Sequence, residues 1–260
     1  RKFMLQLISS QLDMDRMDYL KRDSFYSGVS EGNINSERLI QMMNVVDDVL
    51  VIEEKGIYSV EKFLMSRRLM YWQVYLHKTS LVAELILTKI LKRAKELTQK
   101  GVHLPCSAPL TFFMENKVTI TTFDAETLDL FAQLDDFDII SALKSWQKQD
   151  DFILSSLSKM IVNRDLLKIK LTSEKVTIEE LQPLKERFAT ANNISLLETN
   201  YFIFNGKIKN QAYSKEAEPI RILNKDKTIE DVVDASDQLN LKSLSKSVTK
   251  YYSCFPKQLL

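Results

Sequence analysis

Four polar side chains near the start of the chain are of types that could recognise a phosphate ester. Asp15, Tyr19 and Asp23 are spaced four residues apart, so on a helix they project within about 80° of one another. Arg16 flanks them. A carboxylate can ligate a hard divalent cation, an arginine can hold a phosphate in bidentate geometry, and a phenol can hydrogen-bond to a sugar hydroxyl. The spacing also fits a solvated helix face, and periodicity alone favours that alternative.

A second set of such residues lies further along the chain. Arg67, Tyr71, Tyr75 and Lys78 are predicted to share one stripe of a long helix. A cation beside two phenols and a second cation could bind phosphate and pack against a sugar or base. An interfacial stripe whose basic side chains reach into solvent explains the pattern equally well.

Both sets need helices to hold them, and the composition favours helices. Five glycines and five prolines among 260 residues are too few for a many-stranded β fold. A helix is predicted over 12–23, with Ser9 and Ser10 as its N-terminal cap. Its apolar side, predicted to pack into the protein body, consists of Met14, Met17 and Leu20.

The second set falls in a stretch, 59–99, without glycine or proline, which predicts one very long helix or two joined by a kink. Further helices are predicted near 36–43, 109–115, 124–133, 136–148, 151–163, 178–191 and 229–239. Strands are predicted at 167–171, 201–204 and 219–223, with an Asn205-Gly206 turn leading into 207–213, whereas 45–53 could be a strand or a helical turn. The fold class is therefore mainly α, with a small α+β C-terminal subdomain.

The literal string of the first set carries a family resemblance. Residues 9–24, SSQLDMDRMDYLKRDS, closely resemble a segment of the HD-domain deoxynucleoside triphosphate triphosphohydrolases, the dGTPase-like branch of the HD phosphohydrolases. Both the bacterial enzymes and the vertebrate enzyme with a sterile-alpha-motif domain share it. The family pattern is D-x-D-[RK]-x-D-Y-x-x-R-D followed by a glycine, here Gly28. The resemblance implies a helical HD-superfamily body, of which this chain would be the C-terminal part.

The resemblance also implies roles for the first set. Asp15 would be the last ligand of the family's His…His-Asp…Asp site for a divalent metal ion, which could be Mg, Mn, Fe, Zn or Ni. Arg16 would approach the triphosphate, and Tyr19 and Asp23 would lie against the sugar. The implied substrate is a deoxynucleoside triphosphate, hydrolysed to deoxynucleoside and triphosphate.

The second set resembles the family's second substrate helix. Arg67 would be a phosphate ligand and Tyr75 a wall of the substrate pocket. Leu76 departs from the pattern, because the vertebrate enzyme has a sugar-contacting glutamine there, so sugar discrimination could differ.

The resemblance further implies an effector nucleotide and self-association. Arg38, His77 and Lys78 match family positions that face an effector nucleotide at a subunit interface, and a homo-oligomer is expected. Three parts are predicted: 1–100, the end of the HD domain with both substrate helices; 101–165, an HD-associated helical region; and 166–260, the α+β subdomain.

The other metal ligands of the family are missing from the chain. His77 and His103 are its two histidines, and neither is followed by Asp. We therefore expect the chain alone to be inactive. Either it is a fragment whose parent protein carries the ligands upstream, or it is a degenerate helical binding or scaffold module. A degenerate protein would have little reason to keep both polar sets, which favours the fragment.

Charge and composition narrow the remaining function classes. A net charge of +1 gives no strong case for nucleic acid or an anionic membrane as partner. No apolar run reaches the roughly 18 residues that span a bilayer. Cys106 and Cys254 lie far apart, which predicts a reducing compartment, and a cytoplasmic location is the simplest expectation. The acidic stretch at 134–139 is explained better by helix capping than by a cation site.

Overall fold

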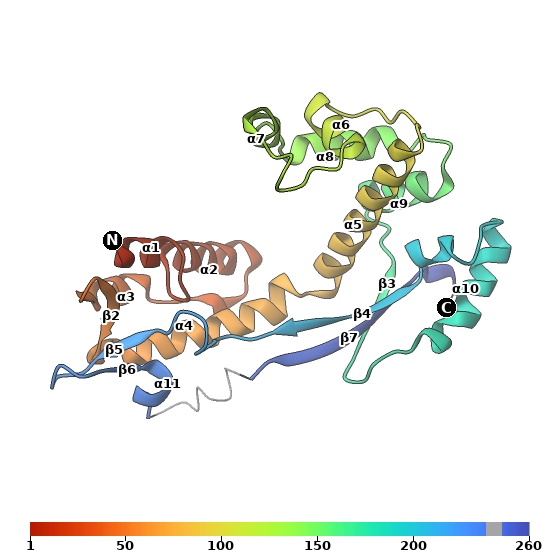
Figure 1. Ribbon diagram of the computed structural model, residues 1–260. Helices are drawn as coiled ribbons and strands as arrows, with labels where there is room; N and C mark the ends of the chain where they lie inside the picture. The colour runs from red at the N-terminus through yellow and green to blue at the C-terminus, as the bar shows by residue number, and fades with distance from the viewer. Residues whose placement is uncertain (238–245, 260) are drawn as a thin grey trace. The chain divides into compact units, whose positions relative to one another are not determined.

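The computed structural model describes residues 1–237 and 246–259 (Figure 1). The chain forms two compact units. The first comprises Arg1–His77 and Lys207–Lys250, and the second comprises Lys78–Gly206 and Tyr251–Leu260. Helices dominate and the sheets are small, which confirms the mainly α fold with a small α+β part. The division into 1–100, 101–165 and 166–260 stays a prediction.

Both predicted substrate helices lie in the first unit. Its helices are α1 (Lys2–Ile8), α2 (Met14–Ser27), α3 (Ser36–Gln41), α4 (Ile57–Met70) and α11 (Val232–Ala235), with short turns η1 (Ser30–Gly32) and η2 (Glu54–Gly56) and the π-helical η3 (Tyr71–Tyr75). The stretch predicted as one long helix or two is thus two helices, since α5 (Lys78–Gln99) begins after an interruption at Leu76 and His77.

Helix α2 begins later than predicted. Its N-cap is Asp13, whose side chain accepts a hydrogen bond from the backbone N–H of Arg16, so the prediction of Ser9 and Ser10 as the cap is wrong. A buried carboxylate that can reach the free N–H groups of the first turn caps the helix better than serines placed before it. Met14 is then the first helical residue and is exposed, contrary to prediction, whereas Met17 and Leu20 are buried as predicted.

A four-stranded sheet completes the first unit, in the order β1-β2-β5-β6. Its strands are β1 (Met43–Val46), β2 (Val49–Glu53), β5 (Arg221–Leu223) and β6 (Ile229–Asp231). The hairpin between β1 and β2 turns at Asp47 and Asp48, both with positive φ. The strand alternative for 45–53 and the strand predicted at 219–223 are confirmed. The helix predicted for 229–239 is wrong at its start, which is β6, and its last two residues lie outside the described part.

The core of the first unit joins the two predicted substrate helices. Met17 and Leu20 of α2 cluster with Phe63 and Leu64 of α4, all fully or almost fully buried. Gly32 of η1 permits this close packing, because an added Cβ would lie 2.6 Å from the Met70 sulfur and 2.8 Å from the Ser24 Cβ. The apolar side of α2 is thereby fixed against α4, and its polar side is left for the site.

The second unit holds the long α5 and the helices that follow it. They are α6 (Ala108–Glu115), α7 (Ala125–Ala132), α8 (Asp136–Trp146), α9 (Phe152–Val162), α10 (Ile178–Asn192), and the short turns η4 (Glu198–Tyr201) and η5 (Lys257–Leu259). The helices predicted near 124–133, 136–148 and 151–163 are confirmed, each capped by an aspartate. The acidic stretch at 134–139 does cap a helix, since Asp135 and Asp138 form a capping box.

The strand predicted at 201–204 and the turn at Asn205-Gly206 are wrong. Residues up to Tyr201 form η4, and Asn205 and Gly206 lie inside strand β4 (Phe204–Asn210). Gly206 is needed there for space rather than for a turn, since an added Cβ would overlap the hydroxyl of Tyr252 on β7 (Val248–Phe255). The three-stranded sheet has the order β3-β7-β4, and the strand predicted at 167–171 is confirmed as β3 (Lys168–Thr172). Among the described residues, no helix combines the length and the apolar character that a membrane crossing requires.

Candidate functional site

The start of α2 is built around Asp13, a residue that the sequence reasoning left without a role. This carboxylate is fully buried and accepts from the backbone N–H of Ser10 at 2.9 Å and of Arg16 at 2.8 Å. It also pairs with the guanidinium of Arg16. Asp13 therefore fixes both the first turn of α2 and the direction of Arg16. Its place one turn before Arg16, at the start of a helical pattern, was the available signal.

Asp15, the predicted metal ligand, lies in the first turn of α2 and is exposed. None of the described residues donates a hydrogen bond to its carboxylate or pairs with it. No group of three or more His, Cys, Asp or Glu side chains within the described residues could hold a metal ion. Asp15 can thus supply one oxygen ligand, but the described residues do not form a metal site by themselves.

Tyr19, Asp23 and Tyr75 meet between α2 and η3. The hydroxyl of Tyr75 donates a hydrogen bond of 2.7 Å to Asp23 Oδ2. The Tyr19 ring packs edge-on against the Tyr75 ring, with 5.9 Å between ring centroids. The structure therefore brings Tyr19 and Asp23 of the first predicted set together with Tyr75 of the second, although the two sets are about fifty residues apart in the chain.

Arg67 joins the same group through Tyr71. Its guanidinium carbon lies 5.9 Å from the Tyr71 ring centroid, and Tyr71 packs edge-on against Tyr75 at 5.2 Å. One terminal nitrogen of Arg67 donates to the carbonyl oxygen of Ala212 at 3.3 Å. The π-helical turn keeps the two tyrosines in contact although the regular helical spacing is broken. We call the group consisting of Arg16, Tyr19, Asp23, Arg67, Tyr71 and Tyr75 the tyrosine cluster.

Both arginines of the tyrosine cluster affect the pKa of the same phenol, Tyr19. Burial, then Tyr71, raises the pKa of Tyr19, while Arg67 and Arg16 act in the opposite direction. Burial, then the hydrogen bond to Asp23, raises the pKa of Tyr75. Both phenols therefore stay protonated at neutral pH and can donate hydrogen bonds. The Nε atoms of Arg16 and Arg67 are buried and have no hydrogen-bond partner within the described residues.

The three residues predicted to face an effector nucleotide are divided between the two units. Arg38 is half-buried on α3, and His77 is exposed after η3. Lys78 begins α5 and belongs to the second unit, so it does not share a helix stripe with Arg67 and Tyr75 as predicted. The interruption of the helix at Leu76 and His77 is the reason.

Lys78 instead lines a basic cavity of the second unit. The cavity measures about 540 Å³ and lies along β3. Four further cationic side chains line it, and the sequence reasoning singled out none of them: Arg164, Lys168, Lys170 and Lys257. Lys168 and Lys170 alternate along the strand, a pattern that was readable as one polar face.

Comparisons with known proteins give the family context of this site. Residues 34–103, which contain α4 and η3, match the family described as HD associated region. The chain is 48% identical to a phosphohydrolase from Bacteroides thetaiotaomicron, with a TM-score of 0.90, over 98% of this chain and 64% of that one.

Two curated relatives extend the comparison. The Bacillus subtilis protein YwfO is 43% identical over 167 residues, which are 64% of this chain and 36% of that protein. The deoxynucleoside triphosphate triphosphohydrolase SAMHD1 homolog of Dictyostelium discoideum is 28% identical over 99 residues, 37% of this chain and 19% of that protein. The chain thus spans 36% of the Bacillus relative. It has the helical fold of an HD-type phosphohydrolase with a small α+β part, and it carries an HD-associated region.

Proposed function

We propose that this chain is part of a metal-dependent HD-type phosphohydrolase that hydrolyses deoxynucleoside triphosphates to deoxynucleoside and triphosphate. The 48% identity to a phosphohydrolase of the same fold supports the general class. The finer assignment to deoxynucleoside triphosphates is supported by the motif in α2 and by the similarity to the Dictyostelium triphosphohydrolase.

The observation that carries the proposal is the composition of the tyrosine cluster. Two arginines act on one phenol, Tyr19, and a second phenol, Tyr75, is held by Asp23. Buried guanidinium nitrogens without partners are costly unless a ligand completes their hydrogen bonds. A triphosphate beside a sugar supplies the matching oxygens and hydroxyls.

In this proposal each side chain has a defined task. Arg16 and Arg67 bind phosphate oxygens, Arg16 from a position fixed by its pair with Asp13. Tyr19 and Asp23 hydrogen-bond to the sugar. Tyr75 forms a wall of the pocket and orients Asp23, because its hydroxyl occupies one carboxylate oxygen and leaves the other free for a ligand.

Asp15 would supply one oxygen ligand to a divalent metal ion. When bound, such an ion polarises a phosphoryl oxygen and lowers the pKa of bound water. The phosphohydrolase of known structure is longer than this chain, which covers 64% of it, and we propose that residues outside these 260 supply the remaining His and His-Asp ligands. Mg, Mn, Fe, Zn and Ni remain candidates.

We also propose that Lys78 belongs to an effector-nucleotide site in a homo-oligomer, supported by the four other cations along its cavity. The roles of Arg38 and His77 in binding an effector nucleotide stay predictions. A catalytically inactive binding or scaffold module remains the second candidate function, favoured by the lack of a metal-binding cluster among the described residues.

The test is nucleotide turnover by the full-length protein. With a divalent metal it should release inorganic triphosphate from deoxynucleoside triphosphates, and a chelator should abolish the release. Asp15→Asn should lower turnover by about 1,000-fold, because a metal ligand is lost. Asp18→Asn is the matched control, since Asp18 is an exposed carboxylate of the same helix that pairs with Arg22.

Release of triphosphate that is unaffected by Asp15→Asn would refute the proposed role of this residue. Full-length protein that turns over no deoxynucleoside triphosphate with any of the five metals would support the scaffold alternative instead.

A further inference from the structure

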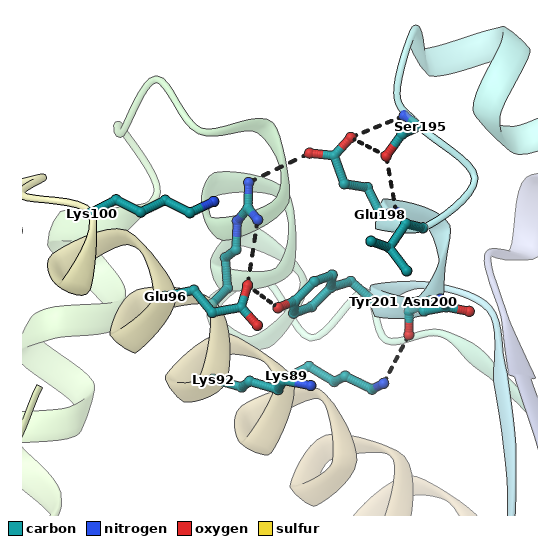
Figure 2. Close-up of a pocket in the computed structure, with 10 residues that line it drawn as sticks. Lys89, Lys92, Glu96, Lys100, Ser195, Glu198, Asn200 and Tyr201 are labelled. Carbon is teal, nitrogen blue, oxygen red and sulfur yellow. Dashed lines mark hydrogen bonds and ion pairs between the residues drawn. The ribbon is translucent and has the colours of Figure 1, made fainter. Parts of the chain in front are cut away.

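The second unit contains a cavity of about 460 Å³ between α5 and the segment around η4 (Figure 2). Its α5 side presents mainly cations, among them Lys89, Lys92 and Lys100. Its other side includes Asn200 and Tyr201. We call this cavity the lysine pocket. It shares no residue with the tyrosine cluster or with the cavity beside Lys78.

The carboxylates at the lysine pocket are already occupied. Arg93 lies among three of them, with nitrogen to oxygen distances of 2.6 Å to Asp151, 3.5 Å to Glu96 and 3.6 Å to Glu198. Glu96 also accepts a hydrogen bond of 2.5 Å from the hydroxyl of Tyr201. These acidic groups therefore hold the wall of the pocket together and are not available to neutralise the lysines.

The lysines, in contrast, have no acidic partner among the described residues. Lys89 Nζ donates to the carbonyl oxygen of Asn200 at 2.8 Å and lies 4.4 Å from the Phe204 ring centroid. Lys185 Nζ donates to Asn200 Oδ1 at 2.7 Å. Within residues 1–237 and 246–259, no carboxylate pairs with Lys89, Lys92, Lys100 or Lys185.

This arrangement disfavours the charged form of Lys89. Burial, then the neighbouring charge of Lys92, lowers the pKa of its ammonium group, and Lys185 acts in the same direction. Lys89 and Lys185 both contact Asn200, and Lys92 lies one helical turn from Lys89, so these like charges repel one another unless an anion lies between them. A bound dianion would offset the repulsion and accept hydrogen bonds from the remaining N–H groups of the half-buried Lys89.

We propose that the lysine pocket binds the phosphate dianion of a small ligand, either inorganic phosphate or a phosphomonoester. Lys89 and Lys92 are one helical turn apart, about 4.5 Å along the axis, so both ammonium groups can reach one phosphate. Lys100 follows the last residue of α5, about 12 Å from Lys92 along the helix axis, and can contact only a larger ligand. The volume leaves room for such an organic part beside Tyr201.

The experiment is calorimetric titration of the full-length protein with sodium phosphate and, separately, with ribose 5-phosphate, at ionic strength held constant with chloride. Saturable binding at one site per chain is expected. Lys92→Gln should weaken it about tenfold or more, because a charge-assisted hydrogen bond is lost from an exposed residue that does not support the fold. Lys89→Met, which keeps the aliphatic body of the side chain, should weaken it at least as much.

Lys144→Gln is the matched control, since it removes the same charge from an exposed position on α8. Tighter binding of ribose 5-phosphate than of phosphate identifies a phosphomonoester as the ligand, and equal binding identifies phosphate itself.

Three results would overturn the proposal. The first is no saturable binding of either anion at millimolar concentration. The second is equal affinity in Lys92→Gln and Lys144→Gln. The third is binding that only Arg67→Ala removes, which would assign the anion to the tyrosine cluster and leave the proposed function standing.

Discussion

The two units use arginine in opposite ways. In the second unit, Arg93 has a side chain that is 12% exposed and lies among three carboxylates, one of which it contacts with two nitrogens. In the first unit, Arg67 donates to a single backbone carbonyl and packs against a tyrosine, and its buried Nε has no partner within the described residues. Both side chains are largely covered, so burial alone does not distinguish them.

We propose that this difference separates a structural arginine, Arg93, from a ligand-binding arginine, Arg67. A guanidinium whose donors are all matched by carboxylates stabilises the fold and has nothing left for a ligand. A covered guanidinium with unmatched donors carries a desolvation cost that a bound phosphate would offset. The comparison therefore predicts that changes at Arg93 affect stability and changes at the tyrosine cluster affect ligand binding.

The largest predicted effect on stability follows from Arg93→Met. This change leaves Asp151 half-buried without its cation and should lower the free energy of unfolding by about 2–3 kcal/mol. Denaturant unfolding of the full-length protein measures it. At a temperature where the variant is folded, kcat/KM should stay within about twofold of wild type. If activity fell by more than the fraction of folded protein, Arg93 would have a role beyond stability, which would contradict the comparison with Arg67.

Gly32→Ala should destabilise the first unit by about 1–3 kcal/mol. The added Cβ would lie 2.8 Å from the Ser24 Cβ, and the Met70 side chain that it also meets is fully buried, so it can move only if the surrounding core repacks. Thermal unfolding monitors the change. Phosphate binding to the lysine pocket should be unaffected, and a variant as stable as wild type would show that α2 and α4 are not held at this contact.

Tyr75→Phe should lower kcat/KM about three- to tenfold while stability changes little. The change removes the 2.7 Å hydrogen bond that orients Asp23 but keeps the ring contacts with Tyr19 and Tyr71. Steady-state kinetics on the full-length protein provide the measurement. Tyr58→Phe is the control, since Tyr58 is an exposed residue of α4. Equal kcat/KM values in Tyr75→Phe and Tyr58→Phe would contradict the claim that Tyr75 orients Asp23.

The smallest effect is a pH dependence of stability in the second unit. Burial alone would raise the pKa of Asp151, but hydrogen bonds from Arg93 and from the backbone N–H of Leu154 outweigh it, so the pKa lies below its usual value. The stabilisation is therefore complete above the unfolded-state pKa of about 4 and is lost as the pH falls through the lower folded-state pKa.

Thermal unfolding of wild type and Asp151→Asn between pH 2.5 and 6 should show this. The stability difference between the two proteins should shrink as the pH drops below about 4. A difference that stays constant across this range would mean that the carboxylate charge does not contribute.

Structural features that depend only on residues close together in the chain could be predicted from the sequence. The helices capped by Asp124, Asp135 and Asp151 were predictable because cap and helix are adjacent in the chain. The polar faces of α2 and α4 were predictable from helical spacing. The hydrogen bond between Tyr75 and Asp23 was not, because it depends on how the two helices pack, although the resemblance assigned both residues to the substrate.

Features that depend on distant partners were missed. Strand β7 was not predicted, and its pairing with β3 joins residues as far apart as Lys168 and Phe255. Asn205-Gly206 suggested a turn, but the sequence could not reveal that the Tyr252 hydroxyl would require a glycine inside β4. The N-cap was placed at the serines although Asp13 is also a preferred cap residue at the start of the pattern, and only its burial depends on tertiary packing.

Equilibrium binding of a deoxynucleoside triphosphate in the presence of a chelator is the most direct test of the tyrosine cluster. In the proposed metal-dependent reaction a chelator prevents turnover, so the affinity that Arg67→Ala loses relative to wild type reports on the tyrosine cluster. Wild-type full-length protein should bind, Arg67→Ala should bind about 10–100-fold more weakly, and Arg93→Met should bind as wild type does. Equal affinity of Arg67→Ala and wild type would contradict the claim that this arginine is there to bind phosphate.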